Sequence, residues 1–289
     1  MKFAAYFEGG VPRVGQVDAA GEQVQALDLS AEQAEAGVLS LVLLQAQGLP
    51  LPGVIGSPVP LTQVKWRAPL PHPRRNLFCV GRNYHAHAKE LAGSVFRNSN
   101  QQTEGWPIVF TKVPETVIAH QETVRLPHGI SEQIDYEAEL AIVIGRAGRN
   151  IPREQALSHI WGYTLVNDVT ARDVQMRHQQ WDLGKSFDTF CPMGPWVVTA
   201  DALDAMHTRI RGWVNGELRQ DARTEDMMFD IPSLIETCSR GITLLPGDII
   251  ATGTPAGVGM GMTPPTYLRR GDRVRVEVDG LGVLENPFD

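Results

Sequence analysis

Acidic side chains occupy alternate positions of the segment Asp135-Tyr136-Glu137-Ala138-Glu139, which leads directly into the apolar stretch 140–144. Successive side chains of a β-strand alternate between its faces, so we expect Asp135, Glu137 and Glu139 to point toward one site at the edge of a buried sheet. Carboxylates that converge in this way repel one another, and Mg²⁺ or Ca²⁺ would offset that repulsion because both prefer oxygen ligands. Taken alone, the pattern fits the polar face of an edge strand better.

Asp168 follows a second strand pattern, 160–166, and precedes a helical pattern over 169–176. Aspartate at such a position is commonly a helix N-cap. As a third carboxylate beside Glu137 and Glu139 it would complete a Mg²⁺ site. Arg172 and Gln175 share one face of the expected helix and could reach a substrate anion, although a plain surface helix would carry them equally well.

Lys185 lies in a segment that also contains Trp181 and Phe187. A lysine among aromatic residues can be partly buried and directed at an anion, whereas most lysines are simply solvated. The glycine-rich segment 253–259 lacks the Gly-Lys-Ser/Thr ending of a phosphate-binding loop. We expect it to form a tight loop that places the Thr254 hydroxyl against a carboxylate.

His87 and Glu90 are three residues apart and would share one side of a helical turn. The carboxylate could then orient the imidazole as a base that activates water. His85 and His87 also allow a transition-metal site, but neighbouring cysteine or further histidine ligands are missing. The third interpretation is an ordinary exposed histidine on a polar turn.

The composition narrows the class of protein. The 289 residues are 43% hydrophobic and 20% charged, as in a globular protein. Their 26 basic and 33 acidic residues give a net charge of −7 without a basic run, which argues against nucleic-acid binding and for small-molecule chemistry. Cys79, Cys191 and Cys238 are widely spaced and predict neither a disulfide framework nor a zinc site.

The sequence predicts a cytoplasmic location. Glu8 comes too early for a signal peptide, and no apolar run approaches the roughly 20 residues that span a membrane. We therefore expect a cytoplasmic protein without membrane association.

The patterning also predicts the elements that must position these residues. Strands are expected over 2–7, 13–17 and 24–27, and a helix from Ser30, with Gln33 completing a capping box, to Gly48. Proline and glycine then interrupt regular structure over 51–60, where we expect a boundary between a small domain, 1–70, and a larger one, 71–289.

In the larger part short strands dominate. Asn215-Gly216 predicts a two-residue hairpin turn, and Asp279-Gly280 follows a strand in which valines alternate with charged residues. A helix is expected over 230–240, with Asp230 as its N-cap and Gly241 just past its end. The prediction is a mainly-β domain with a mixed sheet and few helices.

Taken together, these segments resemble the fumarylacetoacetate hydrolase family. The match follows the family's order through Gly81-Arg82-Asn83-Tyr84 with His87 and Glu90, and then through 107–112, 135–145, 167–175, 184–195 and 245–259. The resemblance implies an α+β, mainly-β fold with a mixed β-sandwich or roll, preceded by a small α/β N-terminal domain. Ala86 departs from many members, which carry aspartate before the histidine, and His85 is another unusual neighbour.

The resemblance also implies roles for single residues. Glu137, Glu139 and Asp168 match the family's metal ligands, and His87 and Glu90 match its acid–base pair. The positions that hold the carboxylate and enolate oxygens of the substrate correspond to Arg172, Gln175, Lys185 and Thr254. A homodimer is expected on the same ground.

The hypothesis that follows is a Mg²⁺-dependent hydrolase, with Mn²⁺ or Ca²⁺ as substitutes. It would cleave a carbon–carbon bond in a 2,4-diketo acid of the acylpyruvate or fumarylpyruvate type, through a metal-stabilised enolate and a water activated by His87, while Lys185 balances negative charge.

The same site also permits oxaloacetate decarboxylation, isomerisation or decarboxylation of a hydroxymuconate-type acid, or ureidoglycolate cleavage, since fold and motif identify a reaction family better than a reaction. A binding protein without catalysis is the alternative from another class. The distal part of the substrate would contact loops such as 91–105.

Overall fold

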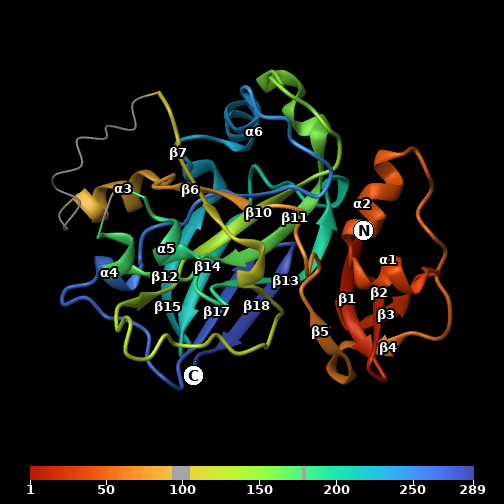
Figure 1. Ribbon diagram of the computed structural model, residues 1–289, viewed down its shortest axis with the longest axis horizontal. Coiled ribbons are helices and arrows are strands. Elements are labelled where there is room, and N and C mark those ends of the chain that lie inside the picture. The colour runs from red at the N-terminus through yellow and green to blue at the C-terminus, as the bar shows by residue number, and fades with distance from the viewer. Residues whose placement is uncertain (93–104, 178–179) are drawn as a thin grey trace.

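The computed structural model describes residues 1–92, 105–177 and 180–289, and the expected substrate loop 91–105 falls almost entirely outside them. Residues 2–67 form an N-terminal lobe beside a larger main body, residues 77–289 (Figure 1). The elements of the lobe are β1 (Lys2–Glu8), β2 (Val11–Val17), β3 (Gln23–Ala26), α1 (Ala31–Glu35), α2 (Leu39–Ala46), β4 (Val59–Pro60) and β5 (Lys65–Arg67).

The lobe confirms the predicted strands and corrects the predicted helix. Ser30 accepts a hydrogen bond from Gln33 N and the Gln33 side chain accepts one from Ser30 N, so the capping box is present. The helix does not run on to Gly48, because Gly37 adopts a φ of +68° and separates α1 from α2. A Cβ at Gly37 would lie 2.6 Å from Pro69 O, so glycine is required at this break.

One long sheet runs through both parts of the molecule. Within the described residues it has twelve strands, ten of them in the order β4-β3-β2-β1-β13-β11-β10-β16-β6-β7. The lobe joins the main body where β1 pairs antiparallel with β13. Parallel pairing of β16 with β6 makes the sheet mixed, as predicted. The expected division at about residue 70 stays a prediction.

The main body carries the remaining strands. They are β6 (Leu77–Gly81), β7 (Ile108–Lys112), β8 (Val117–Ile118), β9 (Ile134–Asp135), β10 (Ala138–Ile144), β11 (Ile160–Asn167), β12 (Thr170–Ala171), β13 (Cys191–Thr199), β14 (Arg209–Val214), β15 (Glu217–Arg223), β16 (Ile249–Ala251), β17 (Arg273–Val278) and β18 (Gly282–Pro287).

The main body also contains four α-helices within the described residues. These are α3 (His85–Ala92), α4 (Arg172–Gln175), α5 (Asp182–Lys185) and α6 (Ile231–Ser239). Short 3₁₀ helices occur in the lobe at Leu61–Gln63 and in the main body at Pro114–Thr116, Arg153–His159, Ala200–Ala202, Thr224–Asp226 and Gly259–Gly261.

A second sheet packs against the middle of the long one. Strands β15, β14, β17 and β18 follow one another in it, and it contacts β10, β11 and β13. Asn215 and Gly216 form the predicted hairpin turn, both with positive φ. Leu140, Ile142 and Ile210 belong to the core between the layers, where their burial contributes roughly 1.5–3 kcal/mol each.

The opposite face of the long sheet is also covered. Leu41 and Val42 of α2 share a buried cluster with Ala141 and Val143 of β10. Strand β10 is therefore buried on both faces, which explains its uninterrupted apolar sequence. Polar residues at the start of such a strand must find partners inside the protein.

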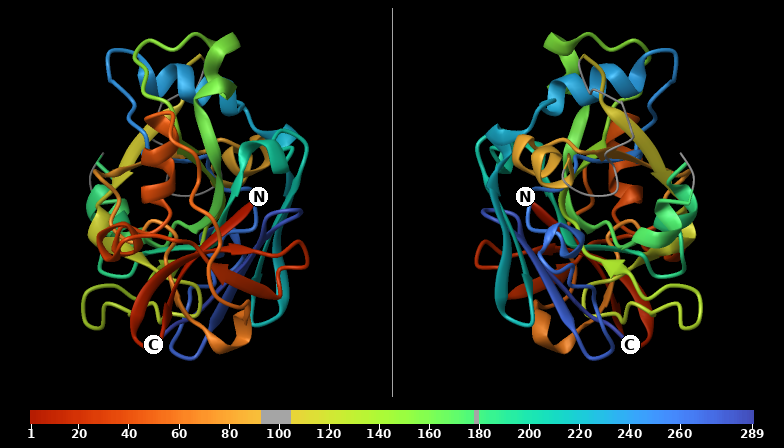
Figure 2. Two further views of the ribbon diagram at one scale, coloured as in Figure 1. Left: turned by 90° about the vertical axis from the view of Figure 1, so that its right-hand side faces the viewer. Right: turned by 90° about the vertical axis from the view of Figure 1, so that its left-hand side faces the viewer.

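The short helices gather on the side of the main body away from the lobe. Figure 1 shows α3, α4 and α5 there, near β6 and β7, and Figure 2 shows the same side facing the viewer in its right panel. Helix α6 begins at Ile231, and the side chain of Asp230 accepts a hydrogen bond from Ser233 N, which confirms the predicted N-cap. The three cysteines are free, in line with the widely spaced positions that predicted no disulfide framework, and all three are buried.

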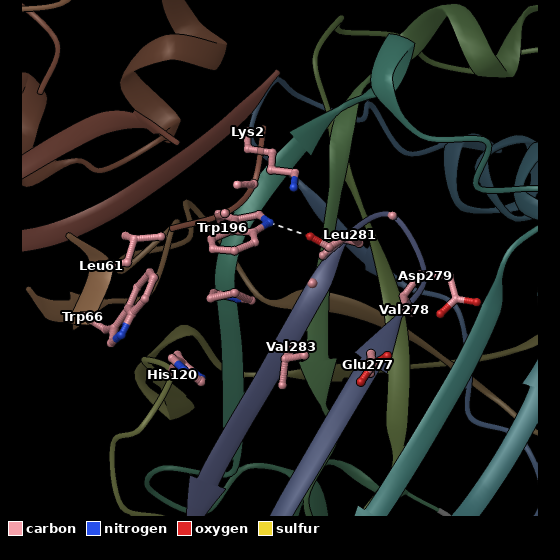
Figure 3. A pocket seen from close by; sticks show the side chains of 15 residues that line it. Lys2, Leu61, Trp66, His120, Trp196, Glu277, Val278, Asp279, Leu281 and Val283 are labelled. Carbon is pink, nitrogen blue, oxygen red and sulfur yellow. Dashed lines mark hydrogen bonds between the residues drawn. The ribbon is translucent and has the colours of Figure 1, made fainter. Parts of the chain in front are cut away.

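The seam between lobe and main body holds an open pocket of about 530 Å³ (Figure 3). Trp66 from the lobe and Trp196 from β13 face it, together with His120. Several of its polar groups already have partners, since Trp196 Nε1 donates to Leu281 O and Glu277 pairs with Arg211. None of its lining residues belongs to the acidic cluster predicted from the sequence.

Among the described residues, no helix combines the length and the apolar character needed to cross a membrane.

Candidate metal centre

Glu137, Glu139 and Asp168 lie together, as the sequence predicted. One oxygen from each falls within 4.8 Å of the others, and all three side chains are buried. Antiparallel pairing of β10 with β11 places Ala138 opposite Asn167, which brings Glu137, just before β10, opposite Asp168, just after β11. Asp168 N donates to Glu137 O and Glu137 N donates to Asn167 Oδ1, so backbone bonds fix this arrangement.

Asp135 does not join this cluster, contrary to the expectation of three carboxylates on one face. Regular pairing stops between β9 and β10, at Tyr136 and Glu137, so strict alternation is lost there. Asp135 instead accepts a hydrogen bond of 2.9 Å from Arg172 Nε. The N-cap interpretation of Asp168 is also wrong, because α4 begins four residues later with Ala171 as its N-cap.

Basic side chains surround the acidic cluster. Lys185 Nζ lies 2.8 Å from Glu137 Oε2 and 2.6 Å from Asp168 Oδ2. Lys112 Nζ donates to Asp168 Oδ1 at 2.7 Å and also to the carbonyls of Val169 and Lys185. Both lysines are almost completely buried, so the partly buried lysine predicted at position 185 is in fact a core residue.

The pKa values of Glu137 and Glu139 are shifted in opposite directions. Burial acts to raise the pKa of Glu137, but Lys185 and Arg172 outweigh it and hold that pKa at about 2. Burial raises the pKa of Glu139 well above its usual value, and the charges of Asp168 and Glu137 raise it further. Burial opposes the charge on Lys185, yet Asp168 and Glu137 leave its pKa raised, so the ammonium persists.

The cluster fits a hard divalent cation. Glu139 Oε1 is buried and has no hydrogen-bond partner within the part of the chain that the structure describes. A buried oxygen without a partner is costly, and a cation that accepts oxygen ligands would satisfy it and reduce the repulsion among the three carboxylates. Glu137, Glu139 and Asp168 are the residues that would hold such an ion.

The His87–Glu90 pair forms as expected on α3. His87 Nδ1 and Glu90 Oε2 are 3.0 Å apart, and the His87 side chain is buried. Glu90 Oε1 accepts a further hydrogen bond of 3.0 Å from Gly257 N. A carboxylate on Nδ1 leaves Nε2 as the ring nitrogen that can exchange a proton.

A small cavity of about 20 Å³ lies between this pair and the acidic cluster. Its lining includes His87, Glu137, Arg172, Gln175, Lys185 and Thr254, which brings the predicted substrate residues to one place. The volume is roughly that of one water molecule. Arg172 and Gln175 are joined by a 3.2 Å hydrogen bond, as expected from their spacing.

The polar groups of Arg172 and Thr254 differ in whether they have hydrogen-bond partners. Arg172 Nη1 lies 2.7 Å from Glu137 Oε1, whereas its buried Nη2 has no hydrogen-bond partner among the residues described. Such a donor is available to an anion in the cavity. The Thr254 hydroxyl donates to Ala138 O rather than to a carboxylate, and Gly253 N is the group that bonds Glu139 Oε2.

The sequence prediction did not include two residues of this site. Arg82 lines the cavity and adopts a φ of +53°, which is uncommon for a residue with a side chain and frequent at functional sites. It stood in the quoted motif 81–84, but nothing in its spacing indicated a role. Lys112 ends the matched segment 107–112 and lies in β7 two residues after the buried Phe110, so this alternation of buried positions was a signal that could have indicated it.

Comparisons with known proteins agree over most of the chain. Residues 76–289 match the family model for the fumarylacetoacetate (FAA) hydrolase C-terminal domain. Oxaloacetate tautomerase YisK of Bacillus subtilis is 48% identical over 227 residues, which cover 78% of this chain and 73% of that protein.

Two solved structures extend the similarity over the whole chain. The fumarylacetoacetate hydrolase of Exiguobacterium antarcticum superposes with a TM-score of 0.85 at 39% identity and covers 100% of this chain and 99% of its own. The maleylpyruvate hydrolase of Sphingobium gives 0.78 at 31% identity, with 100% and 99% coverage. The fold predicted from the resemblance is confirmed.

Proposed function

Because the chain belongs to the fumarylacetoacetate hydrolase family, we propose that it interconverts the keto and enol forms of a small 2-oxo dicarboxylic acid of the oxaloacetate type. The observation that carries this proposal is the cavity between His87 and the acidic cluster, which Arg82, Arg172 and Lys185 line with positive charge. Arginine and lysine side chains bind carboxylates well. The cavity is about the size of one water molecule, so it would receive only one end of such a substrate, and the rest of the substrate would lie outside it.

The metal site is part of the proposal, with Mg²⁺ as the first candidate and Mn²⁺ or Ca²⁺ as alternatives. A divalent cation held by Glu137, Glu139 and Asp168 would supply Lewis-acid polarisation of the 2-oxo group. The unpartnered Glu139 Oε1 supports this assignment.

His87 would move the proton. With Glu90 on Nδ1, His87 Nε2 takes a proton from C3 of the acid, the C3–H pair forms the C2–C3 double bond, and charge passes to the 2-oxygen. Return of a proton to that oxygen completes the enol. Lys185 places a buried positive charge beside the developing anion, and Arg172 Nη2 supplies a donor for a substrate carboxylate.

A relative 48% identical and named an oxaloacetate tautomerase supports this reaction over carbon–carbon hydrolysis, our main expectation from the sequence. Hydrolysis of an acylpyruvate is the second candidate. The His87–Glu90 pair could equally activate a water, and the similar Sphingobium structure is named a maleylpyruvate hydrolase.

One assay separates these reactions. Freshly dissolved enol oxaloacetate is followed by ultraviolet absorbance with and without Mg²⁺, and parallel samples with acylpyruvates and fumarylpyruvate are analysed by mass. We expect faster decay of the enol with no change in mass. Pyruvate plus a carboxylic acid would establish hydrolysis instead, and pyruvate plus carbon dioxide from oxaloacetate would establish decarboxylation. Mg²⁺ without protein corrects for the uncatalysed rates.

We also propose a homodimer in the cytoplasm that acts in the catabolism of small organic acids. Light scattering coupled to size-exclusion chromatography tests the dimer, because a mass near 31.8 kDa would identify a monomer instead.

A further inference from the structure

Asp135 is a buried carboxylate that the proposed chemistry does not use. Its side chain is fully buried, and it lies outside the cluster of Glu137, Glu139 and Asp168. Each of its oxygens accepts two hydrogen bonds, so its capacity to accept is largely filled. A buried carboxylate with four donors holds those donors in place.

The four donors belong to different parts of the site. Asp135 Oδ2 accepts from Arg172 Nε at 2.9 Å and from Met260 N at 3.0 Å. Asp135 Oδ1 accepts from Gly259 N at 2.7 Å and from Tyr136 N at 2.9 Å. One side chain thus joins the guanidinium that faces the cavity to the backbone amides of residues 259 and 260.

That backbone belongs to a loop, residues 253–261, which contacts two other functional groups. Gly253 N donates to Glu139 Oε2 at 2.9 Å, and Gly257 N donates to Glu90 Oε1 at 3.0 Å. Tyr136 OH, next to Asp135 in the chain, donates to Gly257 O at 2.7 Å. The loop therefore connects Asp135 to the carboxylate that orients His87.

Packing leaves the loop little freedom to move. A Cβ at Gly257 would lie 1.8 Å from Arg219 O, and one at Gly261 would lie 2.2 Å from Glu90 Oε1. Gly257 also has a φ of +105°, which side chains rarely adopt. A shift of the amides at 259 and 260 would be transmitted along the loop to Glu90.

We propose that Asp135 is a positioning residue that holds the anion-binding guanidinium of Arg172 and the His87–Glu90 pair in one fixed arrangement, through the amides of Gly259 and Met260. The proposal rests on the roles proposed above for Arg172 and for the pair. An ionised carboxylate accepts on both oxygens, whereas an amide accepts on only one. Asp135→Asn therefore turns a donor toward two N–H groups in either orientation of the amide.

The first test uses hydrogen–deuterium exchange and requires no activity. Asp135→Asn should accelerate exchange in residues 253–261 and in α3 around Glu90. Asp173→Asn is the matched control, because Asp173 neighbours Arg172 on α4 but bonds Ser131 and Val174 N instead. Before the exchange rates are compared, denaturant is added to the wild type until its free energy of unfolding equals that of the variant. A uniform rise over the chain, or an unchanged α3, overturns the proposal.

The second test uses the kinetics with oxaloacetate and double variants. Asp135→Asn should raise KM about tenfold and lower kcat about tenfold. A change of this size in each constant is expected when one charge-assisted hydrogen bond is lost to Arg172 and one is lost to the loop that contacts Glu90. In an Arg172→Met background the effect on KM should vanish while the effect on kcat persists. In a Glu90→Gln background the effect on kcat should vanish. Additive effects in both backgrounds overturn the proposal.

The two tests separate the proposal from the function on which it rests. Absence of turnover in the wild type would contradict the proposed function, while the exchange experiment would still decide whether Asp135 connects the loop to α3.

Discussion

Lys185 Nζ donates a 2.8 Å hydrogen bond to Glu137 Oε2, and both side chains are almost completely buried. An isolated charge at such depth is unfavourable, so each group stabilises the charged form of the other. The same ammonium reaches Asp168 Oδ2 at 2.6 Å. Lys185 therefore neutralises part of the acidic cluster and supplies positive charge to the adjoining cavity.

We predict that Lys185→Met lowers kcat by about 10²–10⁴-fold, since it removes charge beside the developing anion. It should also destabilise the metal-free protein by about 3–5 kcal/mol, because Glu137 and Asp168 lose a buried partner. Added Mg²⁺ should restore part of that stability. Steady-state kinetics and urea unfolding with and without Mg²⁺ measure both effects. Lys89→Met, at an exposed position of α3, is the control, and equal loss in both variants would contradict the assignment.

Glu139→Gln should abolish stabilisation by Mg²⁺ without weakening the metal-free protein. In the wild type, Mg²⁺ at about 100 times its Kd should add about 2.7 kcal/mol. The metal-free variant should be as stable as the wild type or more so, because burial and the neighbouring carboxylates already disfavour the charge on Glu139 and raise its pKa. Thermal unfolding with and without Mg²⁺ checks this, with the exposed Glu132→Gln as control. A full Mg²⁺ response in Glu139→Gln would exclude this metal site.

His87→Ala should reduce the rate of tautomerisation by about 10²–10⁴-fold while leaving the thermal response to Mg²⁺ unchanged, because His87 lies across the cavity from the carboxylates. His85→Ala provides a matched control from the same helix, since His85 is exposed. Enol decay measured by absorbance gives the rates. If His87→Ala kept full activity, the proton transfer would have to be assigned to another group.

His120 should make stability depend on pH. Burial lowers the pKa of His120 to about 4, and its Nδ1 accepts a 3.0 Å hydrogen bond from Glu285 N, which protonation would remove. The unfolded chain has a histidine pKa of about 6.5, so between pH 6.5 and 4 the unfolded state binds more protons. Stability should therefore fall as the pH drops through that window, by an amount on the order of 2 kcal/mol from this group.

The variant His120→Asn keeps an acceptor and removes the titration, so its urea midpoint should depend less on pH than that of the wild type. His72→Asn, at an exposed position, is the control. Identical pH profiles for His120→Asn and the wild type would show that this imidazole does not govern the dependence.

Local patterns in the sequence predicted many of the elements. The capping box at Ser30 and Gln33, the Asn215-Gly216 turn and the N-cap at Asp230 are present because neighbouring residues alone satisfy their hydrogen bonds or φ angles. The helix over 30–48 was wrong at Gly37, where a contact with Pro69 in a distant part of the chain forces a break.

The sequence also determined the acidic cluster, since Glu137 and Glu139 lie at the start of a strand that pairs with the strand ending just before Asp168. Tertiary structure alone decided which carboxylate stays outside it. Asp135 shares the alternation of the two glutamates, but the chain leaves regular pairing at Tyr136, and Arg172 with the amides of residues 259 and 260 binds it elsewhere. The sequence likewise did not predict that the side chains of Lys112 and Arg82 lie at this site. Packing between distant segments determines where a side chain points and how far its charge is removed from water.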